Sequence, residues 1–379
     1  MRDAPSSLES SASPALLTEW VAKPQPMRPR AGSPGPGVTL KRLEWGVPSL
    51  RHRLGALVYD WPRFLRHIGG DWTRIHNRRE TITRDGRGVR CDWVFGSDLH
   101  VAKVYPMAGR ALMRRALKQW PVLLRDTPSD AAREPAVSFV VGHRGMSRLP
   151  NLLTTLRSIA GQSGAPVECI VVEQSERPEV REALPSWVRY LHTPVPSGLD
   201  YCRSATFNAG AEIARGEVLI AHDNDMLAPY RYASEVLARA REGWDFIDLK
   251  RFVFYLPEGT SRALFEGAPL CAETTGEIAQ NLKGGSIAAT RDVYRVVGGY
   301  DEDFVGWGGE DLEFWERARV AGRVYEFGYL PLLHLWHPPQ AGKLDHSKAP
   351  AMQRYDELRL IPPEERIVRL LGRQQLPRK

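Results

Sequence analysis

The chain has 379 residues, of which 42% are hydrophobic and 26% are charged, as expected of a globular, enzyme-sized protein with a buried core. Residues 1–135 contain 23 Lys and Arg against 13 Asp and Glu, whereas the remainder contains 29 against 32. A basic first third suggests contact with anionic lipid, polyanionic glycan or nucleic acid, or simply a solvated basic surface.

The four cysteines lie far apart and form no C-x-x-C pair, which fits a reducing compartment and argues against a Cys-ligated zinc site. The N-terminus lacks the pattern of a signal peptide. The apolar runs are shorter than the roughly 18 residues that a membrane helix needs. We therefore expect a cytoplasmic protein that is soluble or peripheral at the inner face of a membrane.

Residues 1–40 are rich in Pro, Ser and Ala and are predicted to form a disordered leader. Residues 41–134 form a basic N-terminal region, in which apolar positions at helical spacing predict an amphipathic helix over 107–120, ended by Pro121. Such a helix either lies on a membrane or packs against the core, and we favour the core.

From Pro135 the pattern becomes strand, helix, strand: 137–141 and 167–172 are β-rich apolar runs, and 149–159 has apolar residues at helical spacing. This is a βαβ unit with parallel strands. Ligands of such sheets bind beyond the carboxyl ends of the strands, where Arg144 and Glu173 lie.

A second unit follows, with a predicted helix over 204–214 and a strand over 217–221 that leads into Asp223-Asn224-Asp225. Further strands are predicted within 244–256 and 284–289, and a helix over 291–297. Carboxylates at a strand end suit a hard divalent cation, although a D-x-D tripeptide alone is more often a turn.

The segment Gly306-Trp307-Gly308-Gly309-Glu310-Asp311 places two adjacent carboxylates at the start of a predicted helix that Gly322 ends. Such carboxylates could hold a hydroxyl group and accept its proton. Alternatively, they are ordinary acidic residues that stabilise a helix N-terminus through its dipole.

Two histidines, His334 and His337, lie in a strongly apolar setting. A lone histidine there would more often be a core residue, but imidazole also suits Mn²⁺ better than Mg²⁺. Because the aspartates lack an obvious third protein ligand, we predict that one of this pair binds the metal.

These segments, in this order, resemble the metal-dependent GT-A glycosyltransferases, specifically the group that joins a family-2-like nucleotide half to a galactosyltransferase-type C-terminal half. The β-1,4-galactosyltransferases, polypeptide N-acetylgalactosaminyltransferases and bacterial chondroitin polymerases are near this group. The resemblance covers about residues 136–345, and its most specific element runs from Lys283-Gly284-Gly285-Ser286 through Gly298-Gly299-Tyr300-Asp301 to 307–311.

The resemblance implies an α/β GT-A fold, a mostly parallel Rossmann-like sheet flanked by helices, with the basic region as an N-terminal extension. Residues 135–225 would be the nucleotide-sugar-binding half, 226–345 the acceptor-binding and catalytic half, and 346–379 a C-terminal tail. It also implies that Asp225 binds the metal and that Asp223 sits near the ribose and the metal. His334 lies close to the spacing of the family's metal histidine, with His337 in reserve. The other expected donor-binding residues are Arg144, Glu173, Arg203, Gly284 and Gly285. At the position of Glu173 the family more commonly has Asp.

Stereochemistry follows from one position in the same resemblance. Inverting members have Glu-Asp after the paired glycines and use the Asp as base, whereas retaining members commonly have Glu-Asn. Here the pair is Glu310-Asp311, which implies an inverting enzyme with Asp311 as catalytic base. Glu310 would hold the acceptor sugar, Trp307 would stack on it, and Gly309 would let the backbone approach.

The predicted function is therefore transfer of a sugar from a nucleotide diphosphate donor, UDP-linked, to a glycan hydroxyl, in polysaccharide or glycoconjugate synthesis, with Mn²⁺ or Mg²⁺ as cofactor. Contact with a membrane through the basic third is a further expectation, and nucleic acid is not an expected partner. One alternative is a sugar-nucleotidyltransferase, although residues 142–145 are too short and too poor in glycine for its triphosphate loop. The other is a catalytically silent carbohydrate-binding protein of the same fold.

Overall fold

A computed structural model describes residues 49–76, 80–91, 97–130, 133–338 and 349–374. The predicted leader over 1–40 lies outside these residues. The described residues belong to one compact unit, Arg42–Lys379, and the boundaries expected within it near residues 134, 225 and 345 stay predictions. No helix among the described residues is long and apolar enough to span a bilayer.

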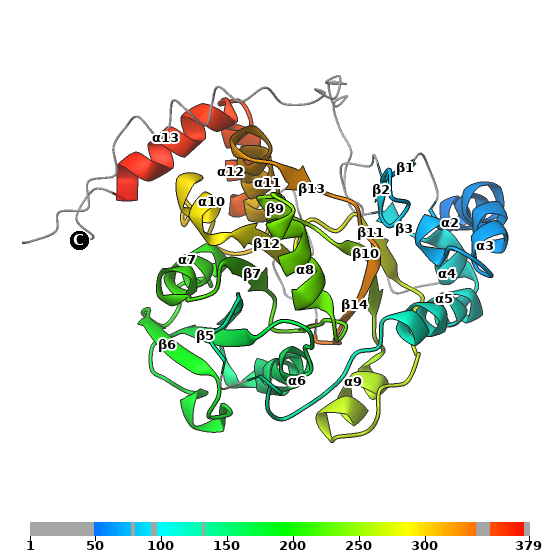
Figure 1. Cartoon of the computed structure of the whole chain (residues 1–379), viewed down its shortest axis with the longest axis horizontal. Helices are drawn as coiled ribbons and strands as arrows, with labels where there is room; N and C mark the ends of the chain where they lie inside the picture. Colours follow the sequence, from blue (N-terminus) through cyan, green and yellow to red (C-terminus); the bar gives the residue numbers. More distant parts are fainter. Residues whose placement is uncertain (1–48, 77–79, 92–96, 131–132, 339–348, 375–379) are drawn as a thin grey trace, which may run out of the picture. The chain divides into compact units, whose positions relative to one another are not determined.

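The main sheet has seven strands in the order β13-β9-β12-β7-β4-β5-β6 (Figure 1). Four strands at one side are parallel: β4 (Val137–His143), β5 (Val167–Ser175), β6 (Arg189–Pro194) and β7 (Val218–His222). Strands β4, β5 and β7 are buried along their whole length, which explains why the sequence shows them as continuous apolar runs.

The other side of this sheet is mixed. Strand β12 (Ser286–Thr290) runs antiparallel to β7 and to β9 (Phe246–Ile247), and β13 (Val324–Tyr325) is parallel to β9. Since Ser286 pairs with His222, the start of β12 lies at the sheet edge where β7 ends. The predicted α/β GT-A sheet is thus confirmed in its main part.

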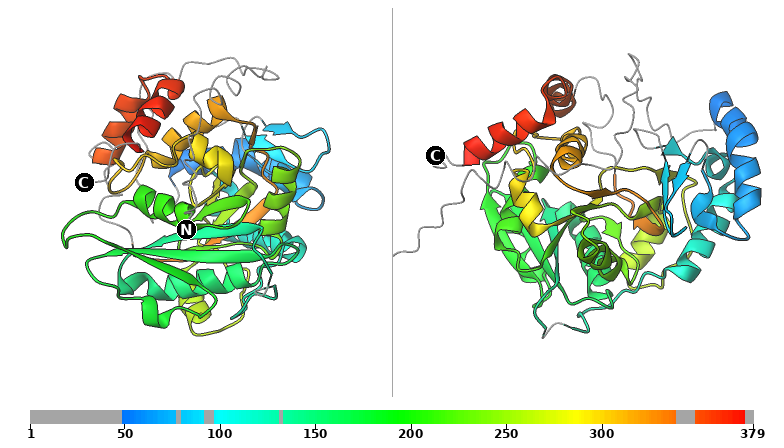
Figure 2. Two further views of the ribbon diagram at one scale, coloured as in Figure 1. Left: turned by 60° about the vertical axis from the view of Figure 1, so that its left-hand side comes forward. Right: turned by 45° about the horizontal axis from the view of Figure 1, so that its top comes forward.

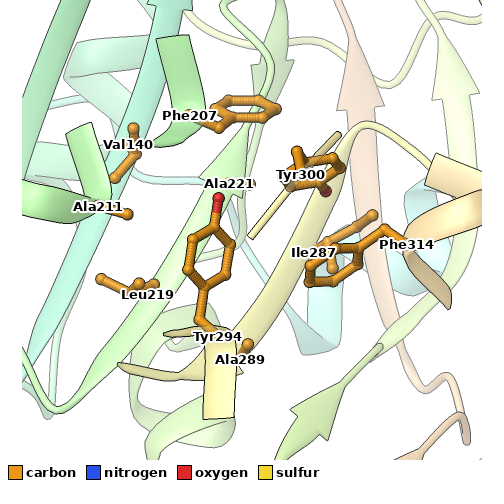
Figure 3. Close-up of a pocket in the computed structure, with 10 residues that line it drawn as sticks. All are labelled: Val140, Phe207, Ala211, Leu219, Ala221, Ile287, Ala289, Tyr294, Tyr300 and Phe314. Carbon is orange, nitrogen blue, oxygen red and sulfur yellow. The ribbon is translucent and has the colours of Figure 1, made fainter. Parts of the chain in front are cut away.

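Helices cover both faces of the main sheet. Consecutive residues of β4, such as Phe139 and Val140, point into different cores. The first core is completed by α6 (Leu149–Ala160) and α8 (Tyr232–Arg241). The second is completed by α7 (Arg203–Ile213), α10 (Arg291–Val296) and α11 (Glu310–Ala321), and Figure 3 shows its aromatic residues around Tyr300.

A second sheet of five strands, which the sequence did not predict as a unit, has the order β3-β11-β10-β14-β8. Its members are β3 (Ser97–Asp98), β8 (Met226–Leu227), β10 (Lys250–Tyr255), β11 (Ile278–Gln280) and β14 (Leu330–His334). In the β14–β8 pair His334 stands opposite Met226, so the end of β14 reaches the loop that follows β7.

The basic N-terminal region packs on this second sheet. It contains α2 (Leu50–Gly55), a π-helical turn η1 (Ala56–Asp60), α3 (Trp61–His67), η2 (Trp72–Arg74), β1 (Glu80–Ile82), β2 (Val89–Cys91), α4 (His100–Val104) and α5 (Pro106–Gln119). The predicted helix over 107–120 is confirmed as α5. Its buried Leu112, Met113 and Ala116 pack in the core shared with β10 and β14, as we favoured.

The segment that we expected as a C-terminal tail is helical in its described part. Residues Pro350–Leu358 and Pro363–Gln374 form helices α12 and α13, which contact α11 (Figure 2). Arg366 of α13 bonds Glu313 and Glu316 of α11, at 3.3 and 2.7 Å. These helices therefore brace α11. The remaining short elements are η3 (Met146–Arg148), η4 (Arg181–Ala183) and α9 (Glu258–Phe265).

Candidate active site

The loop after β7 is held from beneath by a buried histidine. His222 Nε2 donates to the Met226 carbonyl at 3.0 Å, which leaves Nδ1 to accept from the Ser286 hydroxyl at 2.9 Å. Burial lowers the pKa of His222 to about 4, so the ring is neutral as this pattern requires. The Asp223 N–H donates to the Gly285 carbonyl at 2.9 Å. The loop that carries Asp223 and Asp225 is thereby fixed to β12.

Asp225, His334 and His337 form a candidate metal site, since one ligand atom from each lies within 4.8 Å of the others. Nε2 of His334 and of His337 is 3.7 and 3.4 Å from Asp225 Oδ2. The Tyr255 ring stacks on His334 at 4.6 Å, and the His337 Nδ1–H donates to the Pro338 carbonyl. Burial lowers the pKa of His337 to about 4 although Asp225 opposes this, so its imidazole is the neutral, ligating form. One carboxylate and two imidazoles suit a divalent transition-metal ion.

Arg148, from the turn before α6, is a site residue that the sequence analysis missed. Its Nη2 contacts Asp225 Oδ2, and the same nitrogen is 3.4 Å from Asn224 Oδ1. This guanidinium balances the charge of the nearly buried Asp225 carboxylate. The available signal was its place in the loop after the first strand of the βαβ unit, the same loop that contains Arg144.

Arg203, the first residue of α7, joins the two acidic clusters. Its Nε donates to Asp223 Oδ1 at 2.7 Å, and its Nη1 donates to Asp311 Oδ1 at 2.7 Å and to Glu310 Oε1 at 3.2 Å. Burial disfavours the charged guanidinium, but the three carboxylates outweigh burial and hold the pKa of Arg203 well above its usual value. The strand-end aspartates and the acidic helix therefore lie in one site.

Glycines shape the approach to α11. Gly306, Gly308 and Gly309 have φ of 85°, 107° and 85°, in the left-handed region that other residues rarely adopt. A Cβ on Gly308 would lie 2.9 Å from Met352 of α12. The half-buried Trp307 lies between these glycines. The backbone can thus turn sharply and deliver Glu310 and Asp311 as the first two residues of the helix.

The two carboxylates of α11 have different surroundings. Burial raises the pKa of Glu310, and the neighbouring Asp311 raises it further, while Arg203 opposes the shift. Asp311 Oδ1 also receives the Tyr300 hydroxyl at 3.4 Å, and the Tyr300 ring stacks on Phe314 at 4.4 Å in the core of Figure 3. If Glu310 and Asp311 only stabilised the dipole of α11, Asp311 would not need hydrogen bonds from Arg203 and Tyr300. These bonds therefore favour a functional site over an ordinary helix start.

The Gly284-Gly285 pair lies against the same carboxylate. A Cβ on Gly284 would be 2.1 Å from Asp311 Oδ2, so any side chain there would displace Asp311. Gly285 has φ of 83°. A simple turn would explain Gly285, whereas the position of Gly284 is explained by its contact with Asp311.

Arg144 and Glu173 lie where expected, beyond β4 and at the end of β5, but both have protein partners. Arg144 donates to the Leu199 carbonyl at 2.6 Å. Glu173 is buried and accepts from the Tyr190 hydroxyl and the Glu179 N–H at 2.6 and 2.9 Å. Burial raises the pKa of Glu173, but these donors outweigh it, so that the net shift is downward. Contact of either residue with a nucleotide stays a prediction.

Comparison with protein families finds two adjoining matches. The model for "Glycosyl transferase family 2" matches residues 146–285, a segment that contains Arg148, Arg203 and both aspartates after β7. The model for "N-terminal domain of galactosyltransferase" matches residues 278–327, which contain Gly284, Trp307 and the acidic pair of α11. His334 and His337 lie beyond both matches.

Two curated proteins are similar over shorter segments. Probable N-acetylgalactosaminyltransferase 9 of Caenorhabditis elegans is 44% identical over 61 residues, 16% of this chain and 10% of the relative. N-acetylgalactosaminyltransferase 6 of Drosophila melanogaster is 28% identical over 174 residues, 41% of this chain and 26% of the relative. The chain thus spans about a quarter or less of the length of these relatives.

Among solved structures, the catalytic domain of Drosophila β1,4-galactosyltransferase 7 in complex with xylobiose is 17% identical to this chain. The superposition covers 50% of this chain and 63% of that chain, with a TM-score of 0.30.

Proposed function

Because this chain is a GT-A glycosyltransferase of the galactosyltransferase type, with a family-2 segment followed by a galactosyltransferase segment, we propose that it moves a sugar from a nucleotide diphosphate donor to a glycan hydroxyl with inversion. The donor is UDP-linked, and galactose and N-acetylgalactosamine are the first sugars to test, because the relatives are named for their transfer. The product belongs to a polysaccharide or glycoconjugate, and the reaction takes place in the cytoplasm.

The observation that carries the proposal is the position of Arg203 between Asp223 and Asp311. One guanidinium thus donates both to Asp223, an aspartate at a strand end of the donor half, and to Asp311, the proposed base of the acceptor half. Nη2 of Arg203 is buried and has no hydrogen-bond partner within the described part of the chain. That N–H pair is the right donor for a phosphate oxygen of the nucleotide.

The proposed reaction is a single displacement. Glu310 orients the acceptor sugar, and Asp311 takes the proton of its attacking hydroxyl. The new bond forms between that oxygen and the anomeric carbon as the bond from this carbon to the diphosphate breaks, so the nucleotide diphosphate leaves with the bonding pair. Arg203 lies where it can contact the leaving phosphates while it keeps Asp311 in place.

Asp225, His334 and His337 would hold the divalent ion, with Mn²⁺ favoured over Mg²⁺ because two of the three ligands are imidazoles. The ion, when bound, would neutralise charge on the diphosphate.

The proposal is tested by incubating the protein and Mn²⁺ with individual nucleotide sugars. Thermal stabilisation identifies donors that bind, and release of free sugar identifies donors that react. When the donor found in this way is incubated with a glycan acceptor that it glycosylates, the coupling constant of the anomeric proton gives the configuration of the product. Binding of a donor without hydrolysis or transfer would favour a silent carbohydrate-binding protein, and a retained configuration would exclude the displacement.

We expect both His334→Ala and His337→Ala to weaken Mn²⁺ binding, with the larger loss for His334. Loss of a residue behind a ligand costs about 10–100-fold in affinity, so loss of a ligand should cost at least as much. His334 should matter more because β14 pairing and the Tyr255 ring fix its position. Electron paramagnetic resonance of free Mn²⁺ measures the affinity, with His67→Ala in α3 as control. A parental affinity in either variant would remove that histidine from the site.

A further inference from the structure

The outward face of the α2–η1–α3 segment carries a stripe of exposed aliphatic side chains. Leu50, Leu54, Leu57, Val58 and Leu65 are each more than half exposed. They recur at the i, i+4, i+7, i+8 and i+15 positions, which share one side of a helix. Single exposed apolar residues are ordinary, whereas an aligned group of five marks a contact surface. We name these five residues the aliphatic stripe.

The opposite side of the same segment is firmly attached. Asp60 Oδ2 accepts the Val101 N–H of α4 at 2.9 Å, and Ala56 and Phe64 are buried in the core of the N-terminal region. A Cβ on Gly55 would lie 1.9 Å from the His100 ring, so the helix backbone rests directly on α4. The aliphatic stripe is therefore presented on a supported helix.

The apolar surface continues from the stripe to the start of α5. A cavity beside it is lined by Leu54, Leu57, Trp61 and Tyr105, together with Arg53, Ala56 and Val104. Met107, at the start of α5, is also largely exposed. In Figure 1 and in the right-hand view of Figure 2, α2 and α3 lie at the edge of the ribbon, next to α4 and α5.

The exposed charged residues of α2 and α3 are all cationic. Arg51, Arg53 and Arg66 are exposed on α2 and α3, and the only acidic residue of segment 49–67, Asp60, is buried against α4. Arg115 of α5 donates to the Gly69 carbonyl, which brings a further cation to the end of α3.

We propose that this face binds the surface of an anionic lipid bilayer. The aliphatic stripe would enter the boundary between headgroups and acyl chains, while the flanking arginines would contact lipid phosphates. Aliphatic residues with exposed arginines on the same helices fit a fluid anionic surface, which needs no matching shape. The contact is peripheral, and it would keep the enzyme beside a membrane-bound acceptor. It stands independently of the reaction proposed above.

The test is co-sedimentation of the full chain with vesicles of phosphatidylcholine, with or without phosphatidylglycerol. The parent should bind the mixed vesicles, bind pure phosphatidylcholine weakly, and be released by salt. Leu54→Ser/Leu57→Ser should lower the partition coefficient by about tenfold or more, because it removes two leucine side chains that the bilayer would bury. Leu360→Ser/Val368→Ser alters exposed apolar residues near the C-terminus and should leave binding unchanged.

Arg51→Gln/Arg53→Gln should weaken binding to mixed vesicles only, with Arg359→Gln/Arg369→Gln as the matched control. Circular dichroism melts establish that each variant is folded. The proposal is wrong if the parent ignores anionic vesicles, or if the Leu54/Leu57 variant binds them as the parent does. Self-association of the parent that the same variant abolishes, without vesicle binding, would instead make the stripe a protein interface and overturn the proposal.

Discussion

Asp311→Asn should lower turnover by about 10²–10⁴ while donor affinity stays close to that of the parent, because the substitution would remove the proposed general base and change the shape of the site little. The amide oxygen of Asn can still accept from Arg203 and Tyr300, so the ion-pair geometry loses charge but keeps its shape. Donor affinity is measured by titration with UDP and Mn²⁺, and turnover by transfer to the acceptor.

Two matched variants sharpen this result. Glu310→Gln should raise the acceptor concentration needed for half-maximal rate, because its proposed task is to hold the acceptor hydroxyl. Asp292→Asn changes an exposed aspartate at the start of α10 and should behave like the parent. An Asp311→Asn enzyme with near-parental turnover would overturn the assignment of the base while leaving the fold unaffected.

The parts of the fold that follow from the sequence are those dictated by local patterns. Strands β4, β5 and β7 are covered on both faces, so their apolar runs are continuous and easily recognised. The acidic start of α11 could also be recognised in the sequence. The glycines before it permit the left-handed backbone at Gly308 and Gly309, and they mark the turn that leads into the helix. Local signals therefore located the strand-end aspartates and the proposed base.

The parts that could not be predicted depend on long-range pairing. Strand β8 has two residues and no periodicity of its own, yet its pairing with β14 sets His334 beside the Asp225 loop. Arg148 reaches Asp225 across 77 residues, a distance that no local pattern spans. The segment with helices α12 and α13 was expected as a tail. Its contacts with α11, such as the Arg366–Glu316 pair, could not be predicted from local patterns.

Arg203 has both a local position that could be read from the sequence and long-range contacts that could not. The family resemblance implied that it contacts the donor, which stays a prediction, whereas its bonds to Asp311 and Glu310 depend on α11, more than 100 residues further along the chain. One guanidinium can therefore respond to the nucleotide and hold the proposed base. For this reason donor binding and proton removal need separate measurements.

The second large effect is expected from Asp225→Asn, which should abolish the response of donor binding to metal. Asp225 is the one carboxylate that the described part of the chain brings to the candidate metal site, and both histidines face its Oδ2. An amide there therefore removes the negative charge that attracts a cation. The smaller donor-binding term that does not depend on metal, which we attribute to Arg203, should persist.

The measurement is a UDP titration of parent and variant with and without Mn²⁺. The parent should bind UDP more tightly when Mn²⁺ is present, and the variant should lose at least about 10–100-fold of that gain. Asn is chosen over Ala because it can still accept from the half-buried Arg148, so the fold is disturbed less. Asp292→Asn changes an exposed aspartate at the start of α10 and is the control for removal of one negative charge.

If the Asp225 variant binds UDP as the parent does and keeps its response to Mn²⁺, the metal is held elsewhere. In that case the approach of His334 and His337 to Asp225 would reflect packing alone.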